Sequence, residues 1–204
     1  MASLKECARD LVHRRVISIA TYAVDDHTIM AEGALVDDRT NEYHLLSGEA
    51  RPAGIIHHMV IRVLAEGPAL IIREIEVEMP GAPRAECAET RDCLAGACGM
   101  AIGPGFTKQV KALAGGPRGC AHLVTLLLAI APAIIQGYWA HRARRRVTAD
   151  TAAPRKKMDG MLRNTCHVWR EDGPTYAKLM RHLDGETSSP QPPSPAGEGG
   201  ALKR

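Results

Sequence analysis

Polar and apolar residues alternate through much of the first half of the chain, and this alternation is typical of half-buried β-strands. The pattern predicts strands over residues 14–22, 28–36, 42–46, 55–65 and 69–79. Asp37-Asp38-Arg39, a run of charged residues, is expected to break the second strand.

The last two strands predict a β-hairpin, because the turn-forming tripeptide Glu66-Gly67-Pro68 separates them. A three-residue turn sets His58 opposite Glu76 and His57 opposite Val77. His57 then lies on the apolar face of its strand, and His58 and Glu76 lie on the other face.

Helix signals dominate the second half of the chain. The pattern predicts short helices around 84–94 and 106–114, a main helix over about 120–145, a polar linker over 147–158, a last strand over 161–170 and a closing helix over 176–183. From Cys120 to Ala140 no side chain is acidic or basic except His122, so the run is long enough to span a bilayer. Polar residues and a proline interrupt it, and a buried core helix has the same composition.

These elements predict an α+β fold, in which an antiparallel sheet of about five to six strands packs on one long apolar helix and several short helices. A length of 204 residues suits one domain. We expect an N-terminal lead-in over 1–12, a single globular domain over 13–183, and a disordered tail rich in Pro, Gly and Ser over 184–204.

Composition narrows the classes of partner. Aromatic residues make up 3% of the chain, which argues against the base stacking that single-stranded nucleic acids require. The net charge is +3, and the cations after the main helix are Arg142, Arg144, Arg145, Arg146, Arg155, Lys156 and Lys157. This cluster is typical of a solvated helix end, and the alternative is a patch that contacts phosphates. We expect a small-molecule ligand, and neither nucleic acid nor a membrane, as the partner; the oligomeric state stays open.

The six cysteines are expected to be free thiols. The first residues carry charges and no apolar leader segment, which favours a cytoplasmic protein, where thiols stay reduced. No CxxC pair is present, so the cysteine spacing does not predict a structural zinc knuckle.

Cys120, His122 and His57 are the candidate catalytic residues. Cys120 lies near a helix start, where unpaired N–H groups favour a negative charge, so it is a candidate nucleophile; the alternative is an inert buried thiol. Residues two apart on a helix point about 200° apart, so Cys120 and His122 can act together only if Cys120 caps the helix. His57 is either an acid–base group or a satisfied core histidine.

A pocket between the sheet and the main helix is the expected place for these groups. His122 and Gln136 fall on one stripe of the helix, separated by small residues, so Gln136 is a candidate binding residue. His58, Glu76 and Cys87 complete the candidate binding set. No cofactor is predicted; the alternative is a zinc ion held by His57, Cys87, Cys120 and His122.

Several short motifs resemble an uncharacterised bacterial family, domain of unknown function 2889. The pieces follow one another in order: His57-His58-Met59, Pro80, Cys87, Leu94-Ala95-Gly96, Gly103-Pro104-Gly105-Phe106, Gly115-Gly116, Gly119-Cys120-Ala121-His122-Leu123 and Gln136. Upstream, His13-Arg14-Arg15, Asp25-Asp26, Glu32, Leu35 and Asp37 also fit, as do Cys166 and Asp172-Gly173 downstream. The resemblance covers roughly residues 13–173, implies a soluble protein and implies no activity.

The chain departs from the family pattern at two positions. Ala121 stands where the family tends to have Thr, and His58 stands where it tends to have an acid. If that acid orients His57, its role passes to another carboxylate in this chain, and Glu76 is the candidate.

Three function classes remain from the sequence. The first is an enzyme of lyase, isomerase or hydrolase type that acts on a small organic molecule. The second is a non-catalytic protein that binds a small ligand or acts as an accessory. The third is a protein whose basic cluster contacts nucleic acid or a membrane surface.

Overall fold

The computed structural model describes residues 3–4, 6–144, 159–160 and 162–184. The chain divides into two compact units, Met1–Arg145 and Arg146–Arg204. The predicted linker over 147–158, most of the basic cluster and almost all of the predicted tail over 184–204 lie outside the described residues.

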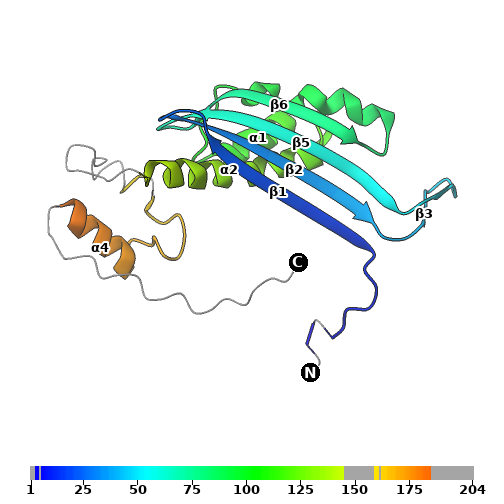
Figure 1. The fold of residues 1–204 in the computed structure, drawn as a ribbon, viewed down its shortest axis with the longest axis horizontal. Coiled ribbons are helices and arrows are strands. Elements are labelled where there is room, and N and C mark those ends of the chain that lie inside the picture. The colour runs from blue at the N-terminus through cyan, green and yellow to red at the C-terminus, as the bar shows by residue number, and fades with distance from the viewer. Residues whose placement is uncertain (1–2, 5, 145–158, 161, 185–204) are drawn as a thin grey trace. The chain divides into compact units, whose positions relative to one another are not determined.

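The first unit is built on an antiparallel sheet of four strands in the order β1-β2-β5-β6 (Figure 1). These strands are β1 His13–Ala23, β2 Thr28–Arg39, β5 Gly54–Glu66 and β6 Ile71–Gly81. β3 Tyr43–His44 and β4 Ala50–Arg51 form a separate two-stranded sheet. The α+β fold is therefore confirmed, with a main sheet slightly smaller than the five to six strands expected.

The register predicted for the last hairpin is wrong. Glu76 lies opposite Arg62, and Val77 lies opposite Ile61, so each partner is four positions from the expected histidine. The physical reason is the position of the turn. β5 continues to Glu66 and β6 begins only at Ile71, so residues 67–70 connect the strands in place of the predicted tripeptide 66–68. His58 lies opposite Gly81.

The second strand does not end at residue 36. β2 runs through the charged run to Arg39, and its alternation between buried and partly buried residues continues up to Asp37. The strand persists because its neighbours on both sides remain paired with it, Arg15 on β1 and His57 on β5. A charged residue therefore reaches the buried face of the sheet.

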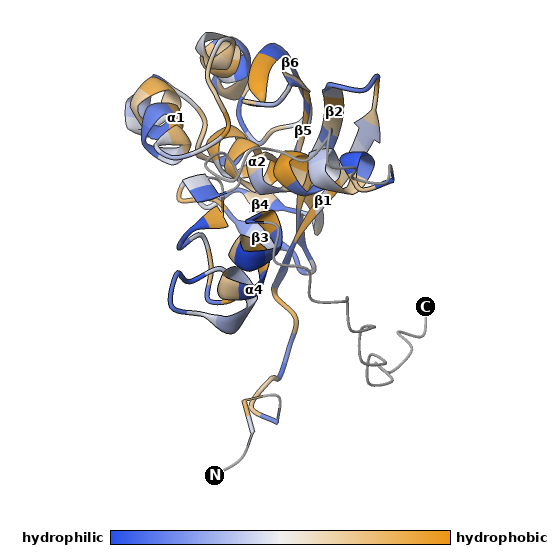
Figure 2. Ribbon diagram, turned by 90° about the vertical axis from the view of Figure 1, so that its left-hand side faces the viewer, coloured by the Kyte–Doolittle hydropathy of each residue, from blue (hydrophilic) through white to orange (hydrophobic). Residues whose placement is uncertain are grey.

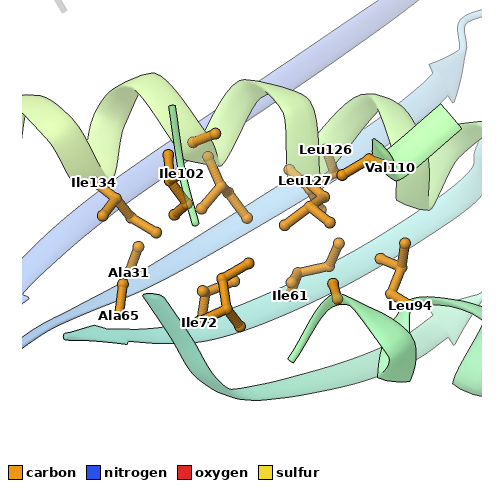
Figure 3. Packing of buried hydrophobic residues seen from close by; sticks show 14 of the residues in the cluster. Ala31, Ile61, Ala65, Ile72, Leu94, Ile102, Val110, Leu126, Leu127 and Ile134 are labelled. Atoms are coloured by element: carbon orange, nitrogen blue, oxygen red, sulfur yellow. The ribbon is translucent and has the colours of Figure 1, made fainter. Parts of the chain in front are cut away.

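The helices of this unit follow the sheet in the chain. They are η1 Ala85–Ala97, α1 Phe106–Ala114, η2 Gly116–Arg118 and α2 Ala121–Arg142, of which η1 and η2 are 3₁₀ helices. α2 lies along one face of the sheet (Figure 1). Its buried side chains, including Leu126, Leu127 and Ile134, point towards Ile61 and Ile72 of the strands (Figure 3).

Hydrophobic residues gather where α2 meets the sheet, as the hydropathy colouring shows (Figure 2). α2 is long and apolar enough to cross a membrane by length and composition alone. The core helix of a globular domain has the same composition, and the side of α2 that faces the sheet supplies much of the hydrophobic core.

Two glycines allow α2 to lie close to the strands. A Cβ at Gly33 of β2 would stand 2.7 Å from the Ile130 side chain, and a Cβ at Gly137 would stand 2.5 Å from the Thr21 hydroxyl of β1. The close approach fixes the height of the helix over β1 and β2, and thereby the position of its N-terminal residues over the ends of these strands.

The described part of the second unit contains α4 Pro174–Leu183, which confirms the predicted closing helix. The strand predicted over 161–170 is wrong, because Leu162 is helical and the residues from Arg163 to Trp169 form turns and bends. Asn164 adopts a positive φ of 58°, and its side-chain oxygen accepts a hydrogen bond from the Glu171 N–H. Local bonds of this kind favour turns over an extended strand.

Candidate functional site

A buried carboxylate lies at the end of β2. Asp37 is 1% exposed and is the only charged residue among the buried residues that the structure describes. It follows Ile29, Ala31, Gly33 and Leu35 on the buried face of the strand, because side chains alternate along it. A charge at such a position requires partners that offset its loss of hydration.

Arg15 supplies the main partner. It lies directly across from Asp37 on β1, with Nε donating to Oδ1 at 2.6 Å and Nη2 donating to Oδ2 at 2.7 Å. This two-pronged pairing is the strongest form of an arginine–carboxylate contact. It lowers the pKa of Asp37 to about 2, despite the opposing effect of burial, so the carboxylate is ionised at neutral pH.

His57 and His13 approach the same carboxylate from the neighbouring strands. His57 lies opposite Asp37 on β5, and its Nδ1 is 3.0 Å from Asp37 Oδ2. Nε2 of His13, at the start of β1, is 3.3 Å from Asp37 Oδ1. The sheet register therefore brings residues far apart in the sequence to one carboxylate.

His122 reaches the carboxylate from the first turn of α2. Its Nε2 is 3.5 Å from Asp37 Oδ2, and its ring stacks on His57 with centroids 3.9 Å apart and planes 29° apart. Burial lowers the pKa of His122, and the positive charges of a protonated His57 and of Arg15 lower it further, whereas Asp37 raises it. The net direction favours the neutral imidazole.

Cys120 is the N-cap residue of α2, with the extended angles φ −98° and ψ 123°. Outside helical geometry the two side chains no longer diverge, and Cys120 Sγ lies 3.8 Å from His122 Nδ1. Cys120 therefore caps the helix, which is the arrangement that a joint action of Cys120 and His122 requires. Thiol, imidazole and carboxylate follow one another in space as Cys120, His122 and Asp37.

The ionised carboxylate also favours one tautomer of each histidine. A carboxylate only accepts hydrogen bonds, so it favours the tautomers in which the ring nitrogens that face it, His57 Nδ1 and His122 Nε2, carry the hydrogens. In a neutral ring the other nitrogen is then an acceptor. His122 Nδ1 thus presents its lone pair to the Cys120 thiol, which is the arrangement that a general base requires.

With this geometry established, comparison with known proteins gives one match. Residues 13–136 match the model of a family described as "Protein of unknown function (DUF2889)". The chain belongs to this family. No curated protein and no solved structure matches the chain.

The part of the chain that matches DUF2889 contains every residue of the Asp37 cluster: His13, Arg15, Asp37, His57, Cys120 and His122. The resemblance inferred from the motifs is confirmed over this region. The match ends at Gln136, before α4 begins.

The other candidate residues lie away from the Asp37 cluster. His58 is on the opposite face of the sheet from His57, and Glu76 is on that face too, 3.7 Å from Arg62, which also pairs with Glu32 and Glu78. Glu76 therefore does not orient His57; Asp37 occupies that position. Gln136 is exposed and lies 14 residues after His122, about 21 Å along the helix.

A metal ion has one candidate set of ligands among the described residues. Ligand atoms of Asp37, His57 and His122 lie within 4.8 Å of one another. The alternative zinc set proposed from the sequence is not assembled, because Cys87, in η1, and Cys120 do not join such a group. Arg15 bonds to both oxygens of Asp37, so a cation there would displace or face a guanidinium. The donor set fits acid–base chemistry better than metal binding.

Sequence reasoning missed Asp37 as a site residue, and with it Arg15 and His13. The available signal was the alternation along 29–37, in which Asp37 falls in phase with four small or apolar residues. An acidic residue in phase with a buried face is uncommon unless it is paired. A charged run after residue 36 also predicts a strand break, and that prediction hides the fact that the alternation of buried residues continues to Asp37.

The His122 ring is expected to titrate below the ordinary histidine pKa of 6.5, because burial and nearby positive charge disfavour its protonation. Proton NMR of the ring hydrogens against pH measures this, with the signal assigned by its absence in His122→Asn. Since the folded pKa is lowered, the neutral ring contributes stability above pH 6.5, and this contribution is lost as the pH falls through the folded pKa. A midpoint above 6.5 would contradict the described surroundings of the ring.

Proposed function

We propose that the protein is an enzyme that acts on a small organic molecule through a nucleophilic thiol, as a hydrolase of activated acyl compounds such as esters or thioesters. One observation carries the proposal: Cys120, His122 and Asp37 are aligned in space, with His122 between the thiol and an ionised carboxylate. A nucleophile, a base and a group that orients the base are the parts that acyl transfer requires.

The chemistry follows from the positions of these atoms. His122 Nδ1 accepts the proton of the Cys120 thiol, and the thiolate attacks the carbonyl carbon of the acyl group, whose π electrons move to oxygen. Asp37 stabilises the imidazolium that forms. When the carbonyl re-forms, the leaving group departs and takes the proton from His122. Water then attacks the thioester and releases the acid and the free thiol.

The start of α2 supports the developing negative charge. Val124 N–H donates to the Cys120 carbonyl, which is the first bond of the helix, so the N–H groups of residues 121–123 have no acceptor within it. These donors and the helix dipole lie next to the nucleophile. Such N–H groups stabilise the oxyanion of a tetrahedral intermediate in acyl-transfer enzymes.

His57 adds a second acid–base group. Its ring stacks on His122 and shares the same carboxylate oxygen, and its Nε2 is the acceptor when the ring is neutral. In the proposed cycle His57 takes the proton of the attacking water, and this proton is returned to the Cys120 sulfur when the tetrahedral intermediate collapses to the acid and the free thiol. The same groups without a covalent step suit a lyase or an isomerase, and without any chemistry they suit a ligand-binding protein.

Reaction with p-nitrophenyl acetate tests the proposal. The wild-type protein is expected to release a burst of p-nitrophenol and to gain one acetyl group on Cys120, measured by absorbance and by mass spectrometry of the peptides. Cys120→Ser is expected to lose the burst, and Cys98→Ser, which changes an exposed thiol, is expected to keep it. A chelator is expected to change neither result.

Acetylation spread equally over the exposed thiols, with none favoured at Cys120, would contradict the proposal. A protein that binds small ligands but is not acetylated at Cys120 would support the non-catalytic alternative instead. Loss of the burst on chelation would favour the metal-binding role of Asp37, His57 and His122.

A further inference from the structure

A second thiol lies beside the start of α2. Cys93, in η1, is partly buried and packs against the hydrophobic core, as Cys120 does. It also touches Gly119, the residue before Cys120: a Cβ at Gly119 would stand 2.9 Å from both the Cβ and the Sγ of Cys93. The absence of a side chain at residue 119 is what allows Cys93 to lie this close to Cys120.

The sulfur of Cys93 faces the backbone of Cys120. Gly119, whose Cβ position lies 2.9 Å from this sulfur, is bonded directly to the Cys120 backbone nitrogen, and the Cys120 N–H and thiol both influence the pKa of Cys93. The Cβ of Cys120 lies two bonds, about 2.5 Å, from that nitrogen. Because Cys93 lies against the residue that precedes Cys120, we infer that rotation of the Cys120 side chain away from His122 brings the two sulfurs within bonding reach.

The two thiols differ in character. Burial is the largest effect on the Cys93 thiol and raises its pKa, so this thiol is protonated at neutral pH. Cys120, in contrast, has the acceptor nitrogen of His122 beside its sulfur, at 3.8 Å. A dithiol redox pair requires two members. One is an attacking thiol with a base beside it, and the other is a neutral thiol nearby.

We propose that Cys93 and Cys120 are a redox pair, which a hydroperoxide converts into a disulfide. The Cys120 thiol gives its proton to His122, and the thiolate attacks one oxygen of the hydroperoxide. The O–O bond breaks, the leaving oxygen takes the proton and departs as an alcohol (as water for hydrogen peroxide), and Cys120 becomes a sulfenic acid. Cys93 then attacks the Cys120 sulfur; the S–S bond forms, the S–O bond breaks, and water leaves with the Cys93 proton.

The balance of the two steps is complete. Two thiols lose two electrons and two protons, and one hydroperoxide gains them and becomes one alcohol and one water. An external dithiol reverses the change by thiol–disulfide exchange. The pair is thus an oxidative modification site at the N-cap of α2.

The disulfide would also regulate the site. Cys120 cannot attack an acyl group while it is bonded to Cys93, and its sulfur has then turned away from His122. This regulatory role rests on the proposed function, whereas formation of the disulfide does not. The two claims can therefore fail separately.

Peptide mapping of the full chain after treatment with hydrogen peroxide tests the proposal. Trypsin places Cys93 and Cys98 together in the peptide 92–108 and Cys120 in the peptide 119–142. The expected product is a disulfide between these two peptides in most molecules, which dithiothreitol reverses. Cys98→Ser is the matched control, since it removes the exposed thiol of the same peptide and is expected to leave the cross-link unchanged.

Cys93→Ser is expected to lower the yield of this cross-link at least tenfold and to leave Cys120 as sulfenic or sulfinic acid. A wild-type protein that forms no cross-link between these peptides would overturn the proposal, and this result does not depend on the folding of any variant. A cross-link that survives in Cys93→Ser but disappears in Cys98→Ser would overturn it as well.

The p-nitrophenyl acetate burst separates the two claims. If the reduced protein shows the burst, peroxide is expected to abolish it and dithiothreitol to restore it, whereas Cys93→Ser no longer recovers fully after peroxide. If the reduced protein shows no burst, the proposed function fails, and the mapped disulfide alone still decides whether the redox pair exists.

Discussion

Asp37→Asn is expected to lower the free energy of unfolding at pH 7 by about 2 kcal/mol. This value corresponds to the difference between the ordinary carboxyl pKa of 3.8 and the pKa of about 2 in the folded protein. The substitution leaves Arg15 and the two stacked histidines without the charge that they surround. Urea denaturation of the variant and the wild type measures the difference, which is read as a shift of midpoint at constant slope.

The effect of pH on this difference has a definite sign. A carboxyl group with a lowered folded pKa stabilises the fold above its unfolded pKa and loses this contribution as the pH falls through its folded pKa. The contribution of the Asp37 carboxylate to the gap between wild type and Asp37→Asn is therefore lost as the pH falls from 3.8 to about 2.

Asp38→Asn is the matched control. Asp38 is the next residue of β2, its side chain is 27% exposed, and it lies 3.4 Å from Arg14, which is itself largely exposed. An exposed pair of this kind contributes less than about 1 kcal/mol. Equal losses in the two variants would show that the buried network around Asp37 does not stabilise the fold as described.

His122→Ala is expected to slow the acetylation of Cys120 by p-nitrophenyl acetate about 100-fold, which is the lower end of the range for loss of a general base. The reason is geometric: His122 Nδ1 is the nitrogen beside the Cys120 sulfur, and Asp37 favours the tautomer that leaves this nitrogen free. Stopped-flow absorbance gives the rate, and acetylated peptides identify the residue.

His58→Ala is the control for this variant, since His58 is on the other face of the sheet, opposite Gly81. Addition of imidazole to the solution is expected to restore part of the rate in His122→Ala and to have no effect on the wild type. A purely structural role of His122 would not give this rescue. If Cys120 reacts as fast without His122 as with it, the thiol has another base and the proposed mechanism is wrong.

The sequence predicted the elements of this fold better than their pairing. Alternation and glycine-rich breaks located all four main strands and placed α1 over Phe106–Ala114, because these signals are local. The register of the β5–β6 hairpin depends on which residues leave the strands at the turn, and the sheet is irregular between His58 and Val60 and between Leu64 and Ala65. Such irregularities depend on packing, which a periodic pattern does not contain.

In the candidate site, too, individual residues could be predicted from the sequence but their pairing could not. His57, Cys120 and His122 were found from their residue types, and the structure brings them together at one end of α2. Glu76 was expected to orient His57 because the assumed register placed it near. Asp37 takes that position instead, and only the pairing of β2 with β5 shows it. Cys93 carries no signal at all in the sequence, since its nearness to Cys120 arises from the contact with Gly119.

The Asp37 network has a consequence for how the protein acquires its function. Its partners come from residues 13–15, 57 and 122, so the network joins the first strand to a helix that the chain enters more than a hundred residues later. Contacts between residues so distant in sequence require the closure of a long loop of chain, which costs conformational entropy. While β1 and β2 alone are paired, Asp37 has an arginine but no imidazole from the helix. The site is therefore complete only when the first strands and the start of α2 are all in place, and a molecule that lacks either part carries an unassisted thiol.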